Sequence, residues 1–428
     1  MSNILILKNI HCLAGILDNN ILQKKGNSMS ELDTLGDAWL YIKDGFIEDY
    51  GSGDFENLIL NDIINNQDSP LLPEDIQIID CSDKTVLPSF CDSHTHLVYA
   101  GSREIEYIDK IKGLSYEEIA KRGGGILNSA DRLHNTSEEQ LYNDAVERLA
   151  EITAYGTGAV EIKSGYGLNT EDELKMLRVI KKLKENSPLA IKSTFLGAHA
   201  VPAEYKGRQH DYVELIINEM IPRIGEEKLA NFIDVFCDKG FFTVDETSAI
   251  LETGIKYGLL PKIHANELDY SGGIQVGVKY KALSVDHLEY TGDEEISVLQ
   301  SSETMATVLP GAAFFLNMIH APVRKMIDAG LAVALASDFN PGSSPSGNMQ
   351  LILSMGCIMY KMLPEETINA CTLNGAYAMG LSESHGSITR GKVANLFITK
   401  KIPGIEYLPY YYGSNKIEKV ILKGRVIN

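Results

Sequence analysis

The sequence has no apolar run that approaches the roughly 18 residues needed for a membrane-spanning helix. Its first seven residues also lack the basic flank and the small-residue cleavage site of a signal peptide, and their apolar stretch is short. That stretch is more typical of a first β-strand. These absences argue against membrane insertion and secretion, so we expect a cytoplasmic protein with no membrane partner.

Cysteines and basic residues are both sparse. The six cysteines are scattered and include no C-x-x-C pair, which argues against a disulfide framework and against a cysteine-based zinc site. With 39 basic and 58 acidic residues, the net charge is −19, and such a chain repels phosphate backbones at long range. Nucleic acid is therefore not an expected partner.

Both ends of the chain show short β-like runs. The runs at 39–42 and 46–47 flank Asp44-Gly45, and an Asp-Gly pair in that position is typical of a hairpin turn. Similar runs return at 393–398, 419–422 and 425–427. We therefore expect residues 1–85 and 388–428 to form one composite β-sandwich domain, with the Asn-, Asp- and Pro-rich stretch 51–75 as a surface excursion.

The middle of the chain, residues 86–387, has a different pattern, in which short apolar runs alternate with longer amphipathic stretches. This alternation is typical of βα units. Helices are predicted over 137–153 and 172–183, and strands over 85–90, 158–162, 192–196, 232–236, 261–263, 282–285, 305–309 and 332–336. Eight strands close a TIM-like (β/α)8 barrel, so we predict an α/β fold with its functional residues at the C-terminal strand ends.

Several predicted strands are followed by side chains that bind metal ions. His94-Thr95-His96 follows the first strand, and residues two apart in an extended backbone face the same way. His264 follows the fifth strand and Asp338 the eighth. Alone, the His-x-His pair is equally consistent with two polar histidines at the barrel rim. However, five of the ten histidines follow predicted strands: His94, His96, His199, His264 and His287.

This concentration predicts one metal ion bound by three imidazoles and one carboxylate, a set that suits zinc or iron and leaves room for water. The predicted ligands are His94, His96, His264 and Asp338. A metal-bound water loses its proton far more readily than free water, which would supply a nucleophile at neutral pH.

Two further residues are candidates for moving protons and charge. Glu267, three residues after His264, is predicted to act as general base and then general acid; its alternative role is to orient a metal ligand. His287 is predicted to polarise the attacked carbonyl or steady the nucleophile as a neutral imidazole, and its alternative role is direct metal ligation.

The segment 87–96, Leu-Pro-Ser-Phe-Cys-Asp-Ser-His-Thr-His, resembles the opening motif of the amidohydrolase superfamily. Six more segments are similar to the imidazolonepropionase family within it, namely 101–103, 163–167, 196–199, 234–237, 338–343 and 372–376. The resemblance runs in register from about residue 85 to residue 398. Ser89 departs from the superfamily pattern, which often has glycine there, and so does Asn395, where an aspartate is common.

This resemblance implies hydrolysis of a cyclic amide, in which 4-imidazolone-5-propanoate and water give N-formimidoyl-L-glutamate in L-histidine degradation. It implies that Arg103, on the first βα loop, pairs with the substrate carboxylate, although a solvated surface arginine is the alternative. The other contacts that it implies for substrate or product are Tyr166, His199, Glu267, Asn340, Gly342 and Ser343. For Tyr166 the alternative is packing at the barrel rim. The resemblance also implies a homodimer with one Zn²⁺ or Fe³⁺ ion per subunit.

Two rival functions stay open at this point. A guanine or cytosine deaminase of the same superfamily would share the metal ligands, Glu267 and His287, but a neutral base gives Arg103 no carboxylate to bind. A non-catalytic barrel that serves as an interaction protein would be expected to have lost ligands, and every proposed ligand is present. Lys239 is predicted to be a charged rim residue rather than a carboxylated lysine that bridges two metal ions.

Overall fold

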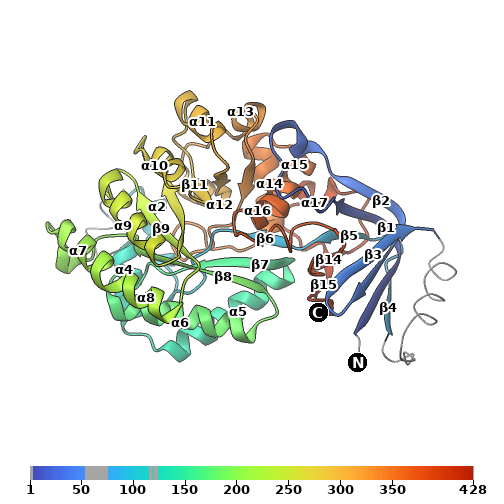
Figure 1. Cartoon of the computed structure of the whole chain (residues 1–428), viewed down its shortest axis with the longest axis horizontal. Coiled ribbons are helices and arrows are strands. Elements are labelled where there is room, and N and C mark those ends of the chain that lie inside the picture. The colour runs from blue at the N-terminus through green and yellow to red at the C-terminus, as the bar shows by residue number, and fades with distance from the viewer. Residues whose placement is uncertain (1–2, 54–75, 115–117, 119–123, 428) are drawn as a thin grey trace.

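The computed structural model describes residues 3–53, 76–114, 118 and 124–427 (Figure 1). Most of the surface excursion predicted at 51–75 lies outside the described residues. Two eight-stranded sheets form the framework of the described chain.

The first sheet contains eight parallel strands that follow one another in chain order. They are β6 (Phe90–Asp92), β7 (Thr157–Lys163), β8 (Ala190–Ala198), β9 (Phe232–Cys237), β10 (Leu260–Ala265), β11 (Ser284–His287), β12 (Met305–Val308) and β13 (Val333–Leu335). A parallel bridge between Thr95 and Phe339 joins the segments that follow the first and last strands. The sheet is therefore a nearly closed barrel, which confirms the predicted (β/α)8 fold.

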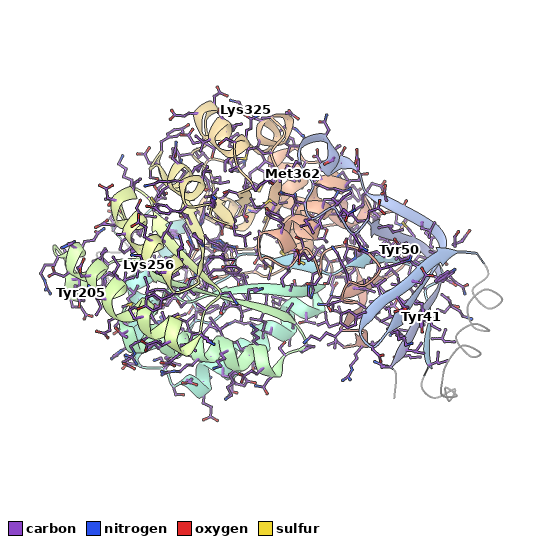
Figure 2. All side chains as sticks on the ribbon, in the orientation of Figure 1. Tyr41, Tyr50, Tyr205, Lys256, Lys325 and Met362 are labelled. Carbon is purple, nitrogen blue, oxygen red and sulfur yellow. The ribbon has the colours of Figure 1, made fainter. Side chains whose placement is uncertain are left out.

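Helices connect the barrel strands and surround them (Figure 1). On the side of β6 to β9 these are α2 (Glu104–Ile111), α4 (Ile126–His134), α5 (Glu138–Ala154), α6 (Thr170–Asn186), α7 (Gln209–Leu215) and α8 (Ile221–Glu227). They continue with α9 (Val244–Lys256), α10 (Gly273–Lys279), α11 (Asp293–Gln300), α12 (Pro310–Leu316), α13 (Val323–Asp328), α14 (Met349–Tyr360), α15 (Pro364–Cys371) and α16 (Leu373–Tyr377). Lys256 and Lys325 mark this outer layer in Figure 2. No helix in the described part of the chain has the length and apolar character to cross a membrane.

Both helices predicted from amphipathic spacing are present. Ser137 caps α5 by accepting a hydrogen bond from the Gln140 backbone N–H, and Asn169 caps α6 in the same way from Asp172. Leu141 lies on the buried face of α5, as the spacing predicted. Because most exposed side chains of each helix are polar, burial of the apolar face fixes how the helix is turned toward the barrel.

The start of the barrel differs from the prediction of one strand over 85–90. The run is two strands: β5 (Thr85–Pro88) pairs with strands of the second sheet, and the barrel begins at Phe90. Between them the Ser89 N–H donates to Asn395 O, whereas the Phe90 N–H donates to Gly156 O. Two successive buried strands give one apolar run in the sequence, so periodicity could not reveal the change of sheet.

The two ends of the chain together build the second sheet. It contains β1 (Ile4–Ile16), β2 (Asp33–Lys43), β3 (Phe46–Ser52), β4 (Ile76–Asp80) and β5, and from the C-terminal end β14 (Leu396–Thr399), β15 (Ile417–Leu422) and β16 (Arg425–Val426). The order is β16-β15-β14-β5-β1-β2-β3, with β4 paired to β1. Asp44 and Gly45 turn between β2 and β3 with φ values of 51° and 90°, as the Asp-Gly signal predicted.

One apolar core joins the strands of both ends. Ile47 of β3, Val86 of β5 and Ile421 of β15 belong to the same buried cluster, although they are up to 374 residues apart in the chain. The separate sheet made from the terminal segments is therefore confirmed. The division of the chain into two domains, 1–85 plus 388–428 and 86–387, remains a prediction. In the structure the change of sheet falls between Pro88 and Phe90.

Candidate active site

The five histidines at strand ends gather at the C-terminal end of the barrel. The ring centroids of His94 and His264 are 4.5 Å apart, those of His96 and His199 are 5.1 Å apart, and those of His264 and His287 are 5.2 Å apart. All five side chains are buried. The C-terminal ends of parallel strands share one face of the barrel, which is why residues so far apart in the sequence meet here.

Three of these histidines have the geometry of a metal site. The ligand atoms of His94, His96 and His264 lie within 4.8 Å of one another. The Nε2 atoms of His94 and His264 are buried without a hydrogen-bond partner, and Asp338 Oδ1 lies 3.6 Å from the Nε2 atoms of both His94 and His96. Unpaired buried nitrogens facing a carboxylate are costly unless a cation sits between them. The residues therefore fit a metal ion.

Two buried carboxylates lie behind the ligand rings. His94 Nδ1 is hydrogen-bonded to Asp286 Oδ2 at 2.6 Å, whereas His264 Nδ1 lies 3.0 Å from Asp234 Oδ2 without the geometry of a hydrogen bond. A carboxylate that accepts the Nδ1 proton leaves Nε2 with its lone pair, which is the form of imidazole that binds a metal. The sequence predictions gave Asp234 and Asp286 no role.

Two buried lysines lie below these carboxylates. Lys163 Nζ is 2.7 Å from Glu161 Oε1 and 2.8 Å from Asp234 Oδ2, and Lys262 Nζ is 2.6 Å from Glu161 Oε2. Both ammonium groups lie 3.8 Å from Asp286 Oδ2. Burial opposes the charge on Lys163, but Asp234 and Glu161 outweigh it and raise the pKa of this lysine. Charged residues within otherwise apolar strands were the signal in the sequence that could have revealed this network.

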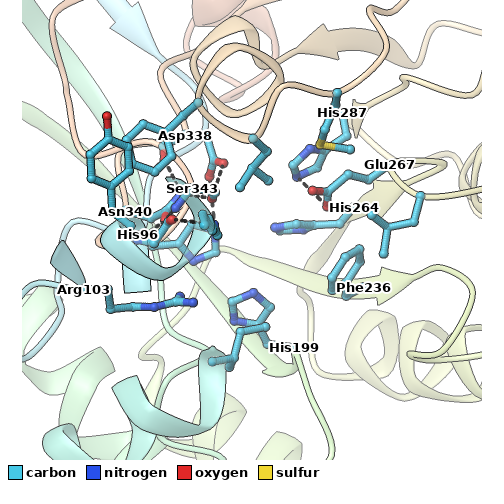
Figure 3. A pocket seen from close by; sticks show the side chains of 18 of the residues that line it. His96, Arg103, His199, Phe236, His264, Glu267, His287, Asp338, Asn340 and Ser343 are labelled. Atoms are coloured by element: carbon cyan, nitrogen blue, oxygen red, sulfur yellow. Dashed lines mark hydrogen bonds and ion pairs between the residues drawn. The ribbon is translucent and has the colours of Figure 1, made fainter. Parts of the chain in front are cut away.

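Glu267 and His287 lie next to each other on one wall of the cavity, with 3.6 Å between Glu267 Oε2 and His287 Nε2 (Figure 3). Burial, and then the charge of Asp338, raise the pKa of Glu267 to about 8. Burial also lowers the pKa of His287 well below its usual value, so the imidazole is neutral at neutral pH. Among the described residues His287 is not part of the metal-binding group, which favours the polarising role over ligation.

A cavity of about 580 Å³ opens over this cluster. It is lined by eleven of the twelve predicted site residues: His96, Arg103, Tyr166, His199, His264, Glu267, His287, Asp338, Asn340, Gly342 and Ser343. The twelfth, His94, is fully buried beneath them. The structure thus brings the whole predicted set together, whereas Lys239 is exposed and paired with Asp269 at 2.7 Å, as a rim residue would be.

Arg103 is fixed against the cavity wall. Its Nε and Nη2 donate to Glu106 Oε2 at 2.9 and 2.7 Å, and its side chain is only 8% exposed. A Cβ atom at Gly342 would lie 2.0 Å from Arg103 Nη1, so only glycine lets the guanidinium lie this close to the loop. Arg103 is therefore not a solvated surface arginine. Glu106 accepts from the Nε and Nη2 edge of the guanidinium, and within the described ranges of the chain Nη1 has no hydrogen-bond partner and lies against Gly342.

The remaining contacts form the floor and one wall of the cavity. His199 Nδ1 lies 2.9 Å from Gly165 O, so it donates there and leaves Nε2 as an acceptor. Tyr166 is buried with its ring centroid 5.7 Å from that of His96. In the loop after Asp338, Asn340 Oδ1 accepts hydrogen bonds from the backbone N–H groups of Gly342 and Ser343, both at 2.8 Å, which holds a tight turn.

Comparisons with known proteins show the family of the chain. The Amidohydrolase family model matches residues 85–427. Imidazolonepropionase from Christiangramia forsetii is 53% identical over 423 residues, covering 99% of this chain and 100% of that protein. Imidazolonepropionase from Flavobacterium johnsoniae is 54% identical over 424 residues, covering 99% and 100%, and the one from Geobacillus sp. is 40% identical over 423 residues, covering 99% and 97%.

Solved structures with low sequence identity share the fold. Guanine deaminase from C. acetobutylicum superposes with a TM-score of 0.68 at 15% identity, covering 100% of both chains. Triazine hydrolase from Arthobacter aurescens gives a TM-score of 0.71 at 13% identity, covering 99% of this chain and 94% of that one. The resemblance drawn from the motifs is confirmed: the chain belongs to the amidohydrolase family and, within it, to the imidazolonepropionases.

Proposed function

We propose that this chain hydrolyses the ring C–N bond of 4-imidazolone-5-propanoate and releases N-formimidoyl-L-glutamate. The observation that carries this proposal is the position of Arg103, which lines the same cavity as the histidine cluster and Glu267. Figure 3 shows the guanidinium of Arg103 pointing toward His96 and His199, so a carboxylate bound by Arg103 would bring the attached ring close to the histidines. Relatives that match the whole chain are named imidazolonepropionase, which supports the same activity.

One zinc or iron ion per chain, Zn²⁺ or Fe³⁺, is the proposed cofactor. His94, His96 and His264 would bind it through their Nε2 atoms, with Asp338 as the carboxylate ligand. Such an ion lowers the pKa of water, so that a nucleophile is available at neutral pH. The donor set suits either metal, because imidazole and carboxylate bind both.

Glu267 would move the proton in this reaction. Its carboxylate takes a proton from the attacking water and delivers it to the ring nitrogen as the C–N bond breaks, so the carbonyl carbon gains the oxygen and the nitrogen gains the hydrogen. A pKa of about 8 suits both steps, because general acid–base catalysis works best near the ambient pH. The neutral imidazole of His287 polarises the carbonyl that is attacked.

The other proposed contacts orient the substrate. Tyr166 and His199 lie on the floor beside His96, and the turn at Asn340, Gly342 and Ser343 borders the guanidinium of Arg103. A homodimer and a cytoplasmic location also stay as proposals. In a guanine or cytosine deaminase Arg103 would have no carboxylate to bind, because guanine and cytosine are neutral bases.

The test follows the ultraviolet absorbance of the imidazolone ring in the presence of purified, metal-loaded protein, with the product identified by mass spectrometry. Formimidoylglutamate is the expected product. Deamination of guanine or cytosine without turnover of the imidazolone would support the rival enzyme. A preparation made without chelator that holds less than about half an equivalent of zinc or iron, and turns over none of these compounds, would support a non-catalytic barrel.

A further inference from the structure

Helix α2 brings a second cation to the cavity. Arg103 is the N-cap residue of α2, and Lys110 lies in its last turn, seven residues or about two helical turns further on, so both side chains leave the same face. Both line the cavity. Lys110 Nζ lies 3.5 Å from the carbonyl oxygen of Gly342, the residue against which Arg103 packs.

The charge of Arg103 is already matched within the protein. Glu106 accepts two hydrogen bonds from the guanidinium and is held in place by the Gly125 N–H at 3.0 Å and by Asn128 Nδ2 at 2.9 Å. Burial acts against ionisation of Glu106, but hydrogen bonds from Arg103 and Asn128 outweigh it and lower the pKa of this carboxyl. The Arg103–Glu106 pair is therefore close to neutral, and it supplies hydrogen bonds more than net charge.

Among the described residues that line this end of the cavity, Lys110 is a cation without an ion-pair partner, although the charge of Glu106 acts on it at longer range. Within the described ranges of the chain it forms no ion pair, and its ammonium lies 5.8 Å from the centroid of the Phe315 ring. The ammonium group of Lys110 is partly desolvated, and this burial, followed by the charge of Arg103, lowers the pKa of Lys110. An ammonium there attracts an anion more strongly than one in bulk water does.

The charge of the whole chain favours a cation at this site. The chain carries a net charge of −19, which repels an anionic substrate at long range, whereas Lys110 places a positive charge on the cavity wall. We propose that Lys110 is a substrate-binding residue that pairs with the tail carboxylate beside Arg103 and selects for the charge of the tail. This inference rests on the proposed function, because it names the same substrate.

The experiment compares metal-loaded wild type with Lys110→Met and Lys110→Arg. For the propanoate substrate, Lys110→Met is expected to raise KM about 10- to 100-fold, which is the scale of a lost charge-assisted hydrogen bond. The value of kcat should change less than about twofold. Lys110→Arg should restore most of the lost affinity. Lys112→Met is the matched control, since Lys112 is an exposed lysine just past the same helix end, and its KM should match wild type.

A substrate with a neutral tail, 4-imidazolone-5-propanamide, separates charge recognition from structural damage. Lys110→Met and wild type should have equal KM values for this amide, and thermal unfolding should show equal midpoints. An equal rise of KM for both substrates, or no rise for the propanoate, would overturn the role of Lys110 and leave the proposed function intact. Wild type that fails to turn over the propanoate would overturn both.

Discussion

The carboxylates behind the histidines yield the sharpest test of the site. Asp286→Asn keeps the shape of the side chain but removes the negative charge that lies 2.6 Å from His94 Nδ1. The asparagine can present either its oxygen or its NH₂ group to that nitrogen, so the Nε2 tautomer is no longer enforced. The substitution also removes the charge that faces Lys163 and Lys262 at 3.8 Å, and a more positive surrounding repels a bound cation.

Carboxylates that orient metal-binding histidines are typically worth a factor of 10 to 100 in metal affinity, or about 1.4 to 2.8 kcal/mol. We expect Asp286→Asn to lie near the upper end, because Asp286 faces one ligand and two ammonium groups without exposure to water. The assay is competition for Zn²⁺ between the protein and a chromophoric chelator at fixed pH, and it requires no turnover.

The same chain offers a matched control. Asp172 Oδ2 lies 2.7 Å from His134 Nδ1, but that histidine is 67% exposed on the outer helices and does not line the cavity. Asp172→Asn should lower the free energy of unfolding slightly and leave the zinc affinity unchanged. If Asp286→Asn binds zinc as tightly as Asp172→Asn does, the carboxylate does not orient the ligand and the reasoning fails.

Three further outcomes are expected. Glu267→Gln should lower kcat about 10²- to 10⁴-fold with full metal content, whereas loss of the metal would show that Glu267 orients a ligand instead. Arg103→Ala should raise KM for the propanoate substrate about 30-fold, or about 2 kcal/mol. An unchanged KM in steady-state kinetics would show that Arg103 does not bind the substrate carboxylate and would contradict the proposed substrate. Burial lowers the pKa of His385 to about 4, below the usual value of about 6.5, so the folded state binds fewer protons and its free energy of unfolding falls as the pH drops from about 6.5 to 4. His385→Gln should remove at most about 3 kcal/mol of that dependence. The free energy of unfolding is measured with denaturant from pH 7.5 to 4.5, and an equal change with pH in wild type and His385→Gln would contradict the prediction.

Much of the candidate site could be read from the sequence because its ligands sit at fixed places in a repeating pattern. His94, His96 and His264 follow or end apolar runs, and in a parallel barrel all such runs end on one face. The eightfold alternation of runs and amphipathic stretches was enough to predict the barrel. Local signals, such as Asp44-Gly45 and the apolar spacing over 137–153, predicted the hairpin and one helix for the same reason: they depend on neighbouring residues alone.

The sequence by itself therefore determined the barrel, the composite sheet and the ring of histidines, whereas their partners were decided only in three dimensions. Asp234 of β9 lies beside His264 of the neighbouring β10, whereas Asp286 of β11 contacts His94, which follows β6, although its register partner is His264. The approach of Lys110 to Gly342 joins positions 232 residues apart. The two strands within 85–90 belong to different sheets because β5 pairs with β1 and β14, whereas β6 pairs with β7. Hydrophobic periodicity records which face of a strand is buried, but burial alone does not specify which charged groups meet inside.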